Sequence, residues 1–286
     1  MTGPGETAGR VPGGLEGLSA LVTGGGSGIG LATAVRFALD GAGVTICGRT
    51  EEKLVAAVAA IDAAVAEAEA SGLLERPAPP ARYVVADVTL EPQIEAAVAA
   101  ATEPTGRLDI LFACAGGAHH MGPLLEAPAE AVRATVDLNL IGSFLSVKHA
   151  GAAMRQGGGG SMVLMSSGAG HFPHRWLWAY GMAKAGVEAL ADYAAEELGE
   201  AGIQVNVVQP GIIDDELMAV ITAGGPLLDD YLAQMPVSRL GTVEDVAAAV
   251  RFLAGPESAW VTGERLTVDG GHHLRRGADY SLLFGG

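Results

Sequence analysis

Short apolar segments alternate with longer segments of helical spacing along almost the whole of this 286-residue chain. Such alternation is typical of a parallel sheet with helices on both faces. Because this alternation uses almost the whole chain, the sequence predicts one α/β domain of the doubly wound kind, not two. The expected strands are residues 18–23, 43–47, 83–86, 108–114, 161–166, 203–208 and 265–268, and the expected helices are residues 29–39, 51–70, 92–101, 129–154, 179–198 and 243–253.

Several segments fall outside this alternation. Residues 1–15 are glycine-rich and are expected to be flexible, and the proline-rich residues 71–81 are expected to form a surface loop. Four consecutive glycines at 157–160 predict a helix end and a turn. The long segment 212–236 is a candidate substrate lid, and residues 272–286 form a tail that could lie at a subunit interface.

Composition limits the classes of partner. Hydrophobic residues make up 49% of the chain and charged residues 17%, which is enough apolar material for a large core. The net charge of −16 argues against nucleic acid or an anionic membrane as the main partner. No secretory signal and no apolar run of about 18 residues occur, so we expect a cytoplasmic protein. Cys47 and Cys114 are too few for a disulfide framework and are expected to be free thiols.

A glycine-rich turn lies between the first expected strand and the first expected helix. Backbone N–H groups at a helix N-terminus bind phosphate, and glycine allows both the tight turn and the close approach of a pyrophosphate. The sequence therefore predicts a dinucleotide site at residues 23–30. The residues expected to form it are Thr23, Gly24, Gly26, Ser27, Gly28, Ile29 and Gly30.

The end of the second expected strand bears on the choice of dinucleotide. An acid there would bind the ribose hydroxyls of NAD, but residues 47–50 contain none, and Arg49 offers a charged fork for the 2′-phosphate of NADP. Ser27 is a counter-signal because it is not basic, Glu51 and Glu52 lie nearby, and Arg49 could merely solvate the start of a helix. The sequence favours NADP(H) over NAD(H).

Three side chains near the fifth expected strand form a candidate catalytic group. Tyr180 and Lys184 are four residues apart on an expected helix, which puts them on one face. An adjacent ammonium stabilises a phenolate and lowers the pKa of a tyrosine. Ser167 ends the preceding strand, at the edge where open α/β sheets bind ligands. We therefore expect the three side chains to converge beside the dinucleotide.

These features resemble the short-chain dehydrogenase/reductase family over about residues 16–271. The resemblance implies a single Rossmann-type domain with a predominantly parallel seven-stranded sheet, a bound nicotinamide dinucleotide, a small-molecule carbonyl or alcohol substrate, and a homodimer or homotetramer. Besides the glycine turn and the three side chains above, the matching motifs are Asp87 after the third strand, Asn139 in Asn-Leu-Ile-Gly, Asn206-Val-Val-Gln-Pro210-Gly211 and Val268-Asp269-Gly270-Gly271.

The resemblance also implies a role for each site residue. Tyr180 is the general acid/base for the substrate oxygen, Ser167 hydrogen-bonds that oxygen, and Lys184 lowers the pKa of Tyr180 and holds the nicotinamide ribose. Asn139 supports a water through its backbone and extends a proton relay. The residues expected to bind the cofactor beside the glycine turn are Arg49, Asp87 at the adenine, Val88, Ala115, Gly116, Pro210, Gly211 and Ile213.

Two positions depart from the family pattern. The usual Asn-Asn-Ala-Gly after the fourth strand is Ala-Cys-Ala-Gly at residues 113–116, so both asparagines are missing. A threonine that bonds the nicotinamide carboxamide often follows the Pro-Gly pair. Here the stretch is Ile212-Ile213-Asp214-Asp215, whose carboxylates can only accept a hydrogen bond.

The segments expected beside the nicotinamide carry histidines and tryptophans. His171 and His174 have no acidic or cysteine partner at metal-ligand spacing, so no metal is expected. Trp176 and Trp178 either cap an apolar pocket or pack at a subunit contact. The basic residues 272–276 could reach a neighbouring subunit's site or anchor a tetramer. The candidate lid favours a bulky apolar substrate through Leu217, Met218, Val220 and Ile221.

Two classes of function are open at this stage. The first is hydride transfer between NADP(H) and a ketone, a steroid-like or a 3-oxoacyl substrate, with an NAD-dependent alcohol dehydrogenase as its variant. The second is a nucleotide-binding sensor or scaffold without catalysis. The intact Asn139, Ser167, Tyr180 and Lys184 argue against the second class.

Overall fold

The computed structural model describes residues 14–72, 74, 78–215, 222–275, 277 and 280–284. Within these residues seven strands form one sheet in the order β3-β2-β1-β4-β5-β6-β7, and every neighbouring pair is parallel. This sheet confirms the α/β prediction. The strands are β1 (Ser19–Thr23), β2 (Gly43–Gly48), β3 (Arg82–Val85), β4 (Ile110–Ala113), β5 (Gly160–Met165), β6 (Ile203–Pro210) and β7 (Arg265–Val268).

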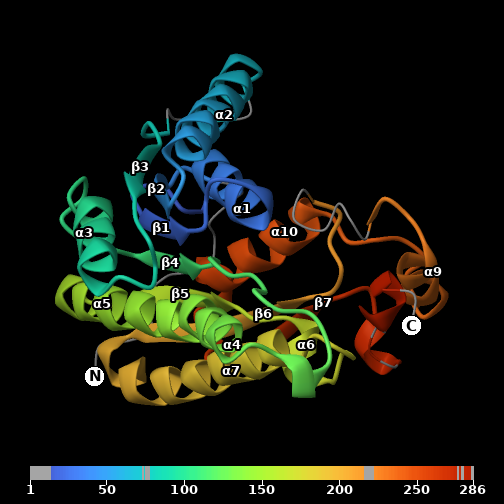
Figure 1. The fold of residues 1–286 in the computed structure, drawn as a ribbon. Helices are drawn as coiled ribbons and strands as arrows, with labels where there is room; N and C mark the ends of the chain where they lie inside the picture. Colours follow the sequence, from blue (N-terminus) through green and yellow to red (C-terminus); the bar gives the residue numbers. More distant parts are fainter. Residues whose placement is uncertain are drawn as a thin grey trace.

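Helices cover both faces of the sheet (Figure 1). One face carries α1 (Gly28–Leu39), α2 (Glu51–Ala70) and α10 (Val243–Ala254), and the other carries α3 (Glu91–Thr102), α5 (Gly142–Gly157) and α7 (Trp178–Leu198). At the carboxyl end of the sheet, the connections include α4 (Ala129–Val136), α6 (Gly168–His171) and α9 (Pro226–Ala233).

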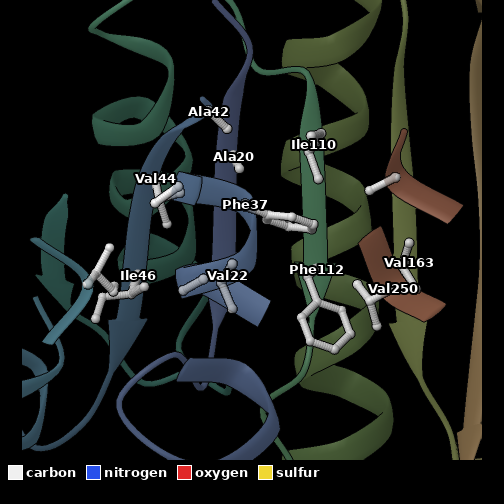
Figure 2. Close-up of a cluster of buried hydrophobic side chains, with 14 of the residues drawn as sticks. Ala20, Val22, Phe37, Ala42, Val44, Ile46, Ile110, Phe112, Val163 and Val250 are labelled. Carbon is white, nitrogen blue, oxygen red and sulfur yellow. The ribbon is translucent and has the colours of Figure 1, made fainter. Parts of the chain in front are cut away.

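Alternation along each strand builds the two layers of core. In β1, Ala20 and Val22 face the α1 side, and Leu21 between them faces the α3 side. Figure 2 shows Phe37 of α1 in the first of these layers, among side chains from several strands. Full burial of such a ring contributes roughly 1.5–3 kcal/mol. Because both faces are covered, the strands are apolar almost without interruption, as the sequence shows.

The long helix expected within 129–154 is interrupted. A π-helical turn, Asp137–Ile141, separates α4 from α5. In it the side-chain amide of Asn139 donates to the carbonyl of Thr135, four residues earlier, at 2.7 Å. That carbonyl is the acceptor that a regular α-helix would give to the backbone N–H of residue 139. Single π-helical turns of this kind occur often at functional sites.

Only some of the predictions for segments outside the strand–helix alternation can be compared with the structure. The four-glycine stretch ends α5, with positive φ at Gly158 and Gly159, as predicted. The candidate lid contains α9, but its apolar residues 217, 218, 220 and 221 lie outside the described residues. Residues 1–13 also lie outside them. In the described part of the chain, no helix is both long enough and apolar enough to cross a membrane.

Candidate active site

The glycine turn joins the end of β1 to the start of α1, as predicted. A Cβ added to Gly30 would lie 2.3 Å from the backbone oxygen of Gly24, so only glycine fits there. Gly28 has a φ of +52°, which also favours glycine. Thr23 does not line the cavity below; its Oγ1 accepts hydrogen bonds from the backbone of Cys114 at 3.1 Å and Ala115 at 3.2 Å, which ties β1 to the end of β4.

One cavity of about 640 Å³ lies along the carboxyl ends of the strands. It brings together every expected site residue except Thr23 and Asn139. Those that line it are Gly24, Gly26, Ser27, Gly28, Ile29, Gly30, Arg49, Asp87, Val88, Ala115, Gly116, Ser167, Tyr180, Lys184, Pro210, Gly211 and Ile213. Residues from six strand ends thus meet in one site, which is where an open α/β sheet binds its ligand.

The serine, tyrosine and lysine converge as their spacing predicts. Ser167 caps α6, with its Oγ accepting from the backbone N–H of Ala169 at 3.3 Å, and it is hydrogen-bonded to Tyr180. Lys184 is 1% exposed, and its Nζ donates to the carbonyl of Met165 at 2.7 Å. The same Nζ lies 5.5 Å from the centre of the Tyr180 ring. The ammonium is therefore held beside the phenol by the end of β5.

The side chain of Asn139 holds the loop after β4. Its Nδ2 donates to the carbonyl of Gly117 at 2.7 Å, and its Oδ1 accepts from the N–H of the same residue at 3.2 Å. A Cβ on Gly116 would lie 2.6 Å from this Oδ1 and 3.1 Å from Lys184 Nζ. The loop therefore runs against both side chains. This positioning contact goes beyond the backbone role expected for Asn139.

Burial decides the protonation of Tyr180 and Lys184. It raises the pKa of Tyr180 to about 12, although the hydrogen bond from Ser167 acts in the opposite direction. It also lowers the pKa of Lys184 to about 8. The sequence predicted a pKa of Tyr180 lowered by Lys184, whereas in the structure the loss of solvent raises this pKa and outweighs the hydrogen bond from Ser167. At neutral pH the phenol keeps its proton and can donate it.

The two departures from the family pattern lie at the cavity wall. Burial raises the pKa of the Cys114 thiol to about 12, so this side chain stays neutral. Among the described residues both cysteines are free, as predicted. Asp215 lies at the glycine turn: a Cβ added to Gly28 would be 2.9 Å from its Oδ2. A carboxylate from the segment after β6 thus lies close to the start of α1.

The other end of the cavity is lined by side chains that the sequence did not single out as site residues. They include Phe172, Tyr231, His272, Tyr280 and Leu283. Tyr231 falls in the candidate lid, and Tyr280 and Leu283 belong to the tail, so position in those segments was the available signal. The tail was expected to reach a neighbouring subunit's site or to anchor a tetramer, and the structure places Tyr280 in the cavity of its own chain.

Some aromatic side chains of residues 171–178 line the cavity, and others pack against the rest of the protein. His174 lines the cavity, whereas Trp176 and Trp178 do not. Trp178 instead meets His120 edge to face, with ring centres 6.3 Å apart. Within the residues that the structure describes, no group of three His, Cys, Asp or Glu side chains could hold a metal ion.

Comparison with known proteins agrees with this site. A family model described as Enoyl-(Acyl carrier protein) reductase matches residues 24–273. A solved short-chain type dehydrogenase/reductase from Mycobacterium ulcerans is 42% identical, with a TM-score of 0.88, and the match covers 93% of this chain and 94% of that one. The chain belongs to the short-chain dehydrogenase/reductase family.

Two further members of this family have more specific names. A cis-4-hydroxycyclohexanecarboxylate dehydrogenase from Sinomonas cyclohexanicum is 36% identical over 253 residues, covering 88% of this chain and 95% of its own. The solved structure of a levodione reductase is 32% identical, with a TM-score of 0.82 and coverage of 91% and 99%. Each name describes the substrate of that relative.

A nicotinamide dinucleotide, which the short-chain dehydrogenase/reductase family uses, fits the residues present. The glycine turn leaves room for a pyrophosphate. Gly24 and Gly28 have positive φ angles that favour glycine, and a Cβ on Gly30 would meet the backbone of Gly24. The amino end of α1 points its unpaired N–H groups there. Lys184 and Ser167 lie farther along the same cavity. One elongated ligand can therefore span from the glycine turn to the phenol.

Proposed function

We propose that this protein is an NADP(H)-dependent oxidoreductase that interconverts a ketone and a secondary alcohol, with Tyr180 as the general acid/base. The observation that carries the proposal is Tyr180 hydrogen-bonded to Ser167 and flanked by Lys184, in the cavity that continues to the glycine turn. The nicotinamide, when bound, donates or accepts the hydride.

The residues of the chain handle the proton. In the reduction direction Ser167 and Tyr180 hold the carbonyl oxygen of the substrate, and the phenol donates its proton to that oxygen as negative charge develops there. In the oxidation direction the phenolate accepts the proton of the alcohol. Lys184, fixed by the carbonyl of Met165, places a positive charge beside the phenolate and stabilises it.

Arg49 supports the choice of NADP(H). It follows β2, is exposed, and lines the cavity, and residues 47–50 offer no carboxylate to a ribose. A guanidinium can pair with a phosphate through two hydrogen bonds. We expect Arg49→Ala to raise the Kd of NADPH about tenfold, or about 1.4 kcal/mol, and to leave NADH binding unchanged in a fluorescence titration. Tighter binding of NADH than NADPH by the wild type, unaffected by this change, would establish the NAD-dependent alternative.

Among the substrate classes, a small ketone or secondary alcohol has the most support. The levodione reductase and the cis-4-hydroxycyclohexanecarboxylate dehydrogenase carry the names of ring compounds. The wall of the cavity beyond Tyr180 is largely apolar and aromatic, with Phe172, Leu177 and Tyr231. Such a wall suits an apolar ring beside the reacting oxygen.

The deciding experiment is a screen of the purified protein for NADPH oxidation and NADP⁺ reduction over a ketone and alcohol library. Tyr180→Phe removes the proton donor and leaves the ring, so it is expected to lower kcat at least about 100-fold, since general acid–base catalysis contributes about 10² or more. Its Kd for NADPH should stay within about twofold. Unchanged kcat in Tyr180→Phe, or no activity of the wild type on any member, would favour the non-catalytic sensor or scaffold.

A homodimer or homotetramer belongs to the same proposal. Large apolar side chains are exposed on α5 and α7, with Phe144 44%, Met182 51% and Tyr193 73% accessible. Exposed apolar side chains on neighbouring helices favour association. Light scattering on the purified protein measures the mass, and a monomer would contradict this part of the proposal.

A further inference from the structure

The C-terminal segment Tyr280–Phe284 packs against the substrate end of the site. In Figure 1 it lies beside α9, at the edge of the molecule that carries the carboxyl ends of the strands. A Cβ added to Gly277 would be 2.2 Å from the carbonyl oxygen of Pro173. The backbone at Gly277 is therefore in close contact with the loop before α7. Leu282 and Leu283 join an apolar cluster with Leu177. The tail is therefore docked on its own subunit by several contacts.

Tyr280 projects into this end of the cavity. It is 5% exposed, it lines the cavity together with Tyr180, and its ring meets His174 edge to face with centres 6.1 Å apart. Burial raises its pKa above the ordinary value, and the charges of Tyr180 and Tyr231 act in the same direction. The phenol of Tyr280 therefore keeps its proton over the whole working range of pH.

Two neighbouring polar side chains of this wall, Tyr231 and His174, hydrogen-bond to the backbone. The hydroxyl of Tyr231 accepts from the backbone N–H of Ile212 at 2.9 Å. Nδ1 of His174 lies 3.1 Å from the carbonyl of Phe172, which can only accept, so this nitrogen carries the proton. In the part of the chain that the structure describes, the hydroxyl of Tyr280 makes no hydrogen bond. A hydroxyl without a protein partner in a cavity wall gains free energy from a polar group of a ligand.

We propose that Tyr280 is a specificity-determining residue whose hydroxyl donates a hydrogen bond to a second oxygen of a compact ring ketone, while Ser167 and Tyr180 hold the reacting oxygen. This inference rests on the proposed function and narrows its substrate class. A rigid ring keeps two oxygens at a fixed separation, so binding to two separate phenols costs little conformational entropy. The tail adds Tyr280 and Leu283 to this end of the cavity, which leaves less room for a long acyl chain or a carrier-bound thioester.

The test compares two ring ketones that differ by one oxygen, cyclohexanone and 1,4-cyclohexanedione, on the wild type and on Tyr280→Phe. We expect the variant to lose about tenfold in kcat/KM on the dione, which corresponds to about 1.4 kcal/mol, the size of one hydrogen bond. On cyclohexanone it should stay within about twofold. Tyr83→Phe, which removes an exposed hydroxyl of β3 outside the cavity, is the matched control and should change neither value.

An equal loss on both ketones, or no loss on the dione, overturns the role of Tyr280. If the wild type reduces neither ketone, the proposed function fails for this substrate class, and calorimetric binding of the same two ketones then tests Tyr280 by itself. Weaker binding of the dione to Tyr280→Phe, with cyclohexanone unaffected, supports the inference. Equal affinities of both variants for the dione reject it independently of catalysis.

Discussion

Asp215 brings a negative charge to the start of α1. Its Oδ2 would lie 2.9 Å from a Cβ on Gly28, and the first turn of α1 has no acidic residue of its own. The amino end of a helix carries a partial positive charge that favours anions, and the family's dinucleotide places its pyrophosphate at this turn. The carboxylate would therefore lie near the pyrophosphate, and its negative charge should weaken dinucleotide binding.

We predict that Asp215→Asn lowers the Kd of NADPH about 3- to 10-fold, or by about 0.7–1.4 kcal/mol, because the repulsion is removed while the shape is kept. A fluorescence titration measures this. Asp214→Asn is the matched control, since it removes the same charge from an adjacent exposed side chain and should have little effect. Weaker binding by Asp215→Asn would mean that this carboxylate contacts the cofactor favourably.

The pKa values of the catalytic pair predict different pH profiles for the two directions. Alcohol oxidation needs the phenolate of Tyr180, whose pKa is raised to about 12 by burial, so kcat should rise from pH 6 to about 8 and level off above it, where Lys184 loses the charge that stabilises this phenolate. Ketone reduction needs the protonated phenol and should be flat at neutral pH. It should fall above about pH 8, where Lys184 loses its charge.

Steady-state kcat measured against pH in both directions checks this prediction. In Lys184→Met the fall in reduction above pH 8 should disappear, because no ammonium is left to titrate. A pH-independent rate of alcohol oxidation would show that Tyr180 is not the group that accepts the proton.

At the scale of elements, the turn between β1 and α1 depends on close contact. We predict that Gly30→Ala weakens NADPH binding more than tenfold and lowers the Tm, because its Cβ would meet the backbone oxygen of Gly24 at 2.3 Å and the turn would have to open. Gly199→Ala is the control: no atom lies within 4 Å of its Cβ, and its φ of −57° suits alanine. Equal Tm and Kd for both variants would contradict the close contact.

Those parts of the fold and site that depend on local spacing could be predicted from the sequence. The glycine turn and the Tyr180–Lys184 pair were predictable because they depend on local spacing at the ends of elements, which alternation already places on one edge of the sheet. The π-helical turn at Asn139 was not, since it depends on a side-chain hydrogen bond that periodicity does not show. The raised pKa of Tyr180 and the position of Tyr280 also escaped prediction, because burial and the docking of a tail follow from distant contacts.

At the scale of the whole molecule, a buried ion pair links α1 to α10, which lie on the same face of the sheet. Arg251 of α10 pairs with Asp40, which follows α1, and its Nη1 pairs with Glu257 at 2.5 Å. Arg251 and Asp40 are 8% and 9% exposed, and the pair links positions 211 residues apart in the sequence. A buried ion pair of this kind costs desolvation to form, but loss of one partner leaves the other charge buried and unpaired.

We therefore predict that Arg251→Met lowers the free energy of unfolding by about 3 kcal/mol, because Asp40 then keeps only the longer contact with Arg36, at 3.7 Å. Urea denaturation followed by circular dichroism measures the loss. Arg82→Met is the control: Arg82 pairs with Glu103 at 2.8 Å, but both side chains are at least half exposed, so the expected change is below about 1 kcal/mol. A second variant, Asp40→Asn with Arg251→Met, should recover part of the loss, since it removes the buried charge that the single change leaves behind. Equal destabilisation by Arg251→Met and Arg82→Met would mean that the buried pair does not hold α1 and α10 together.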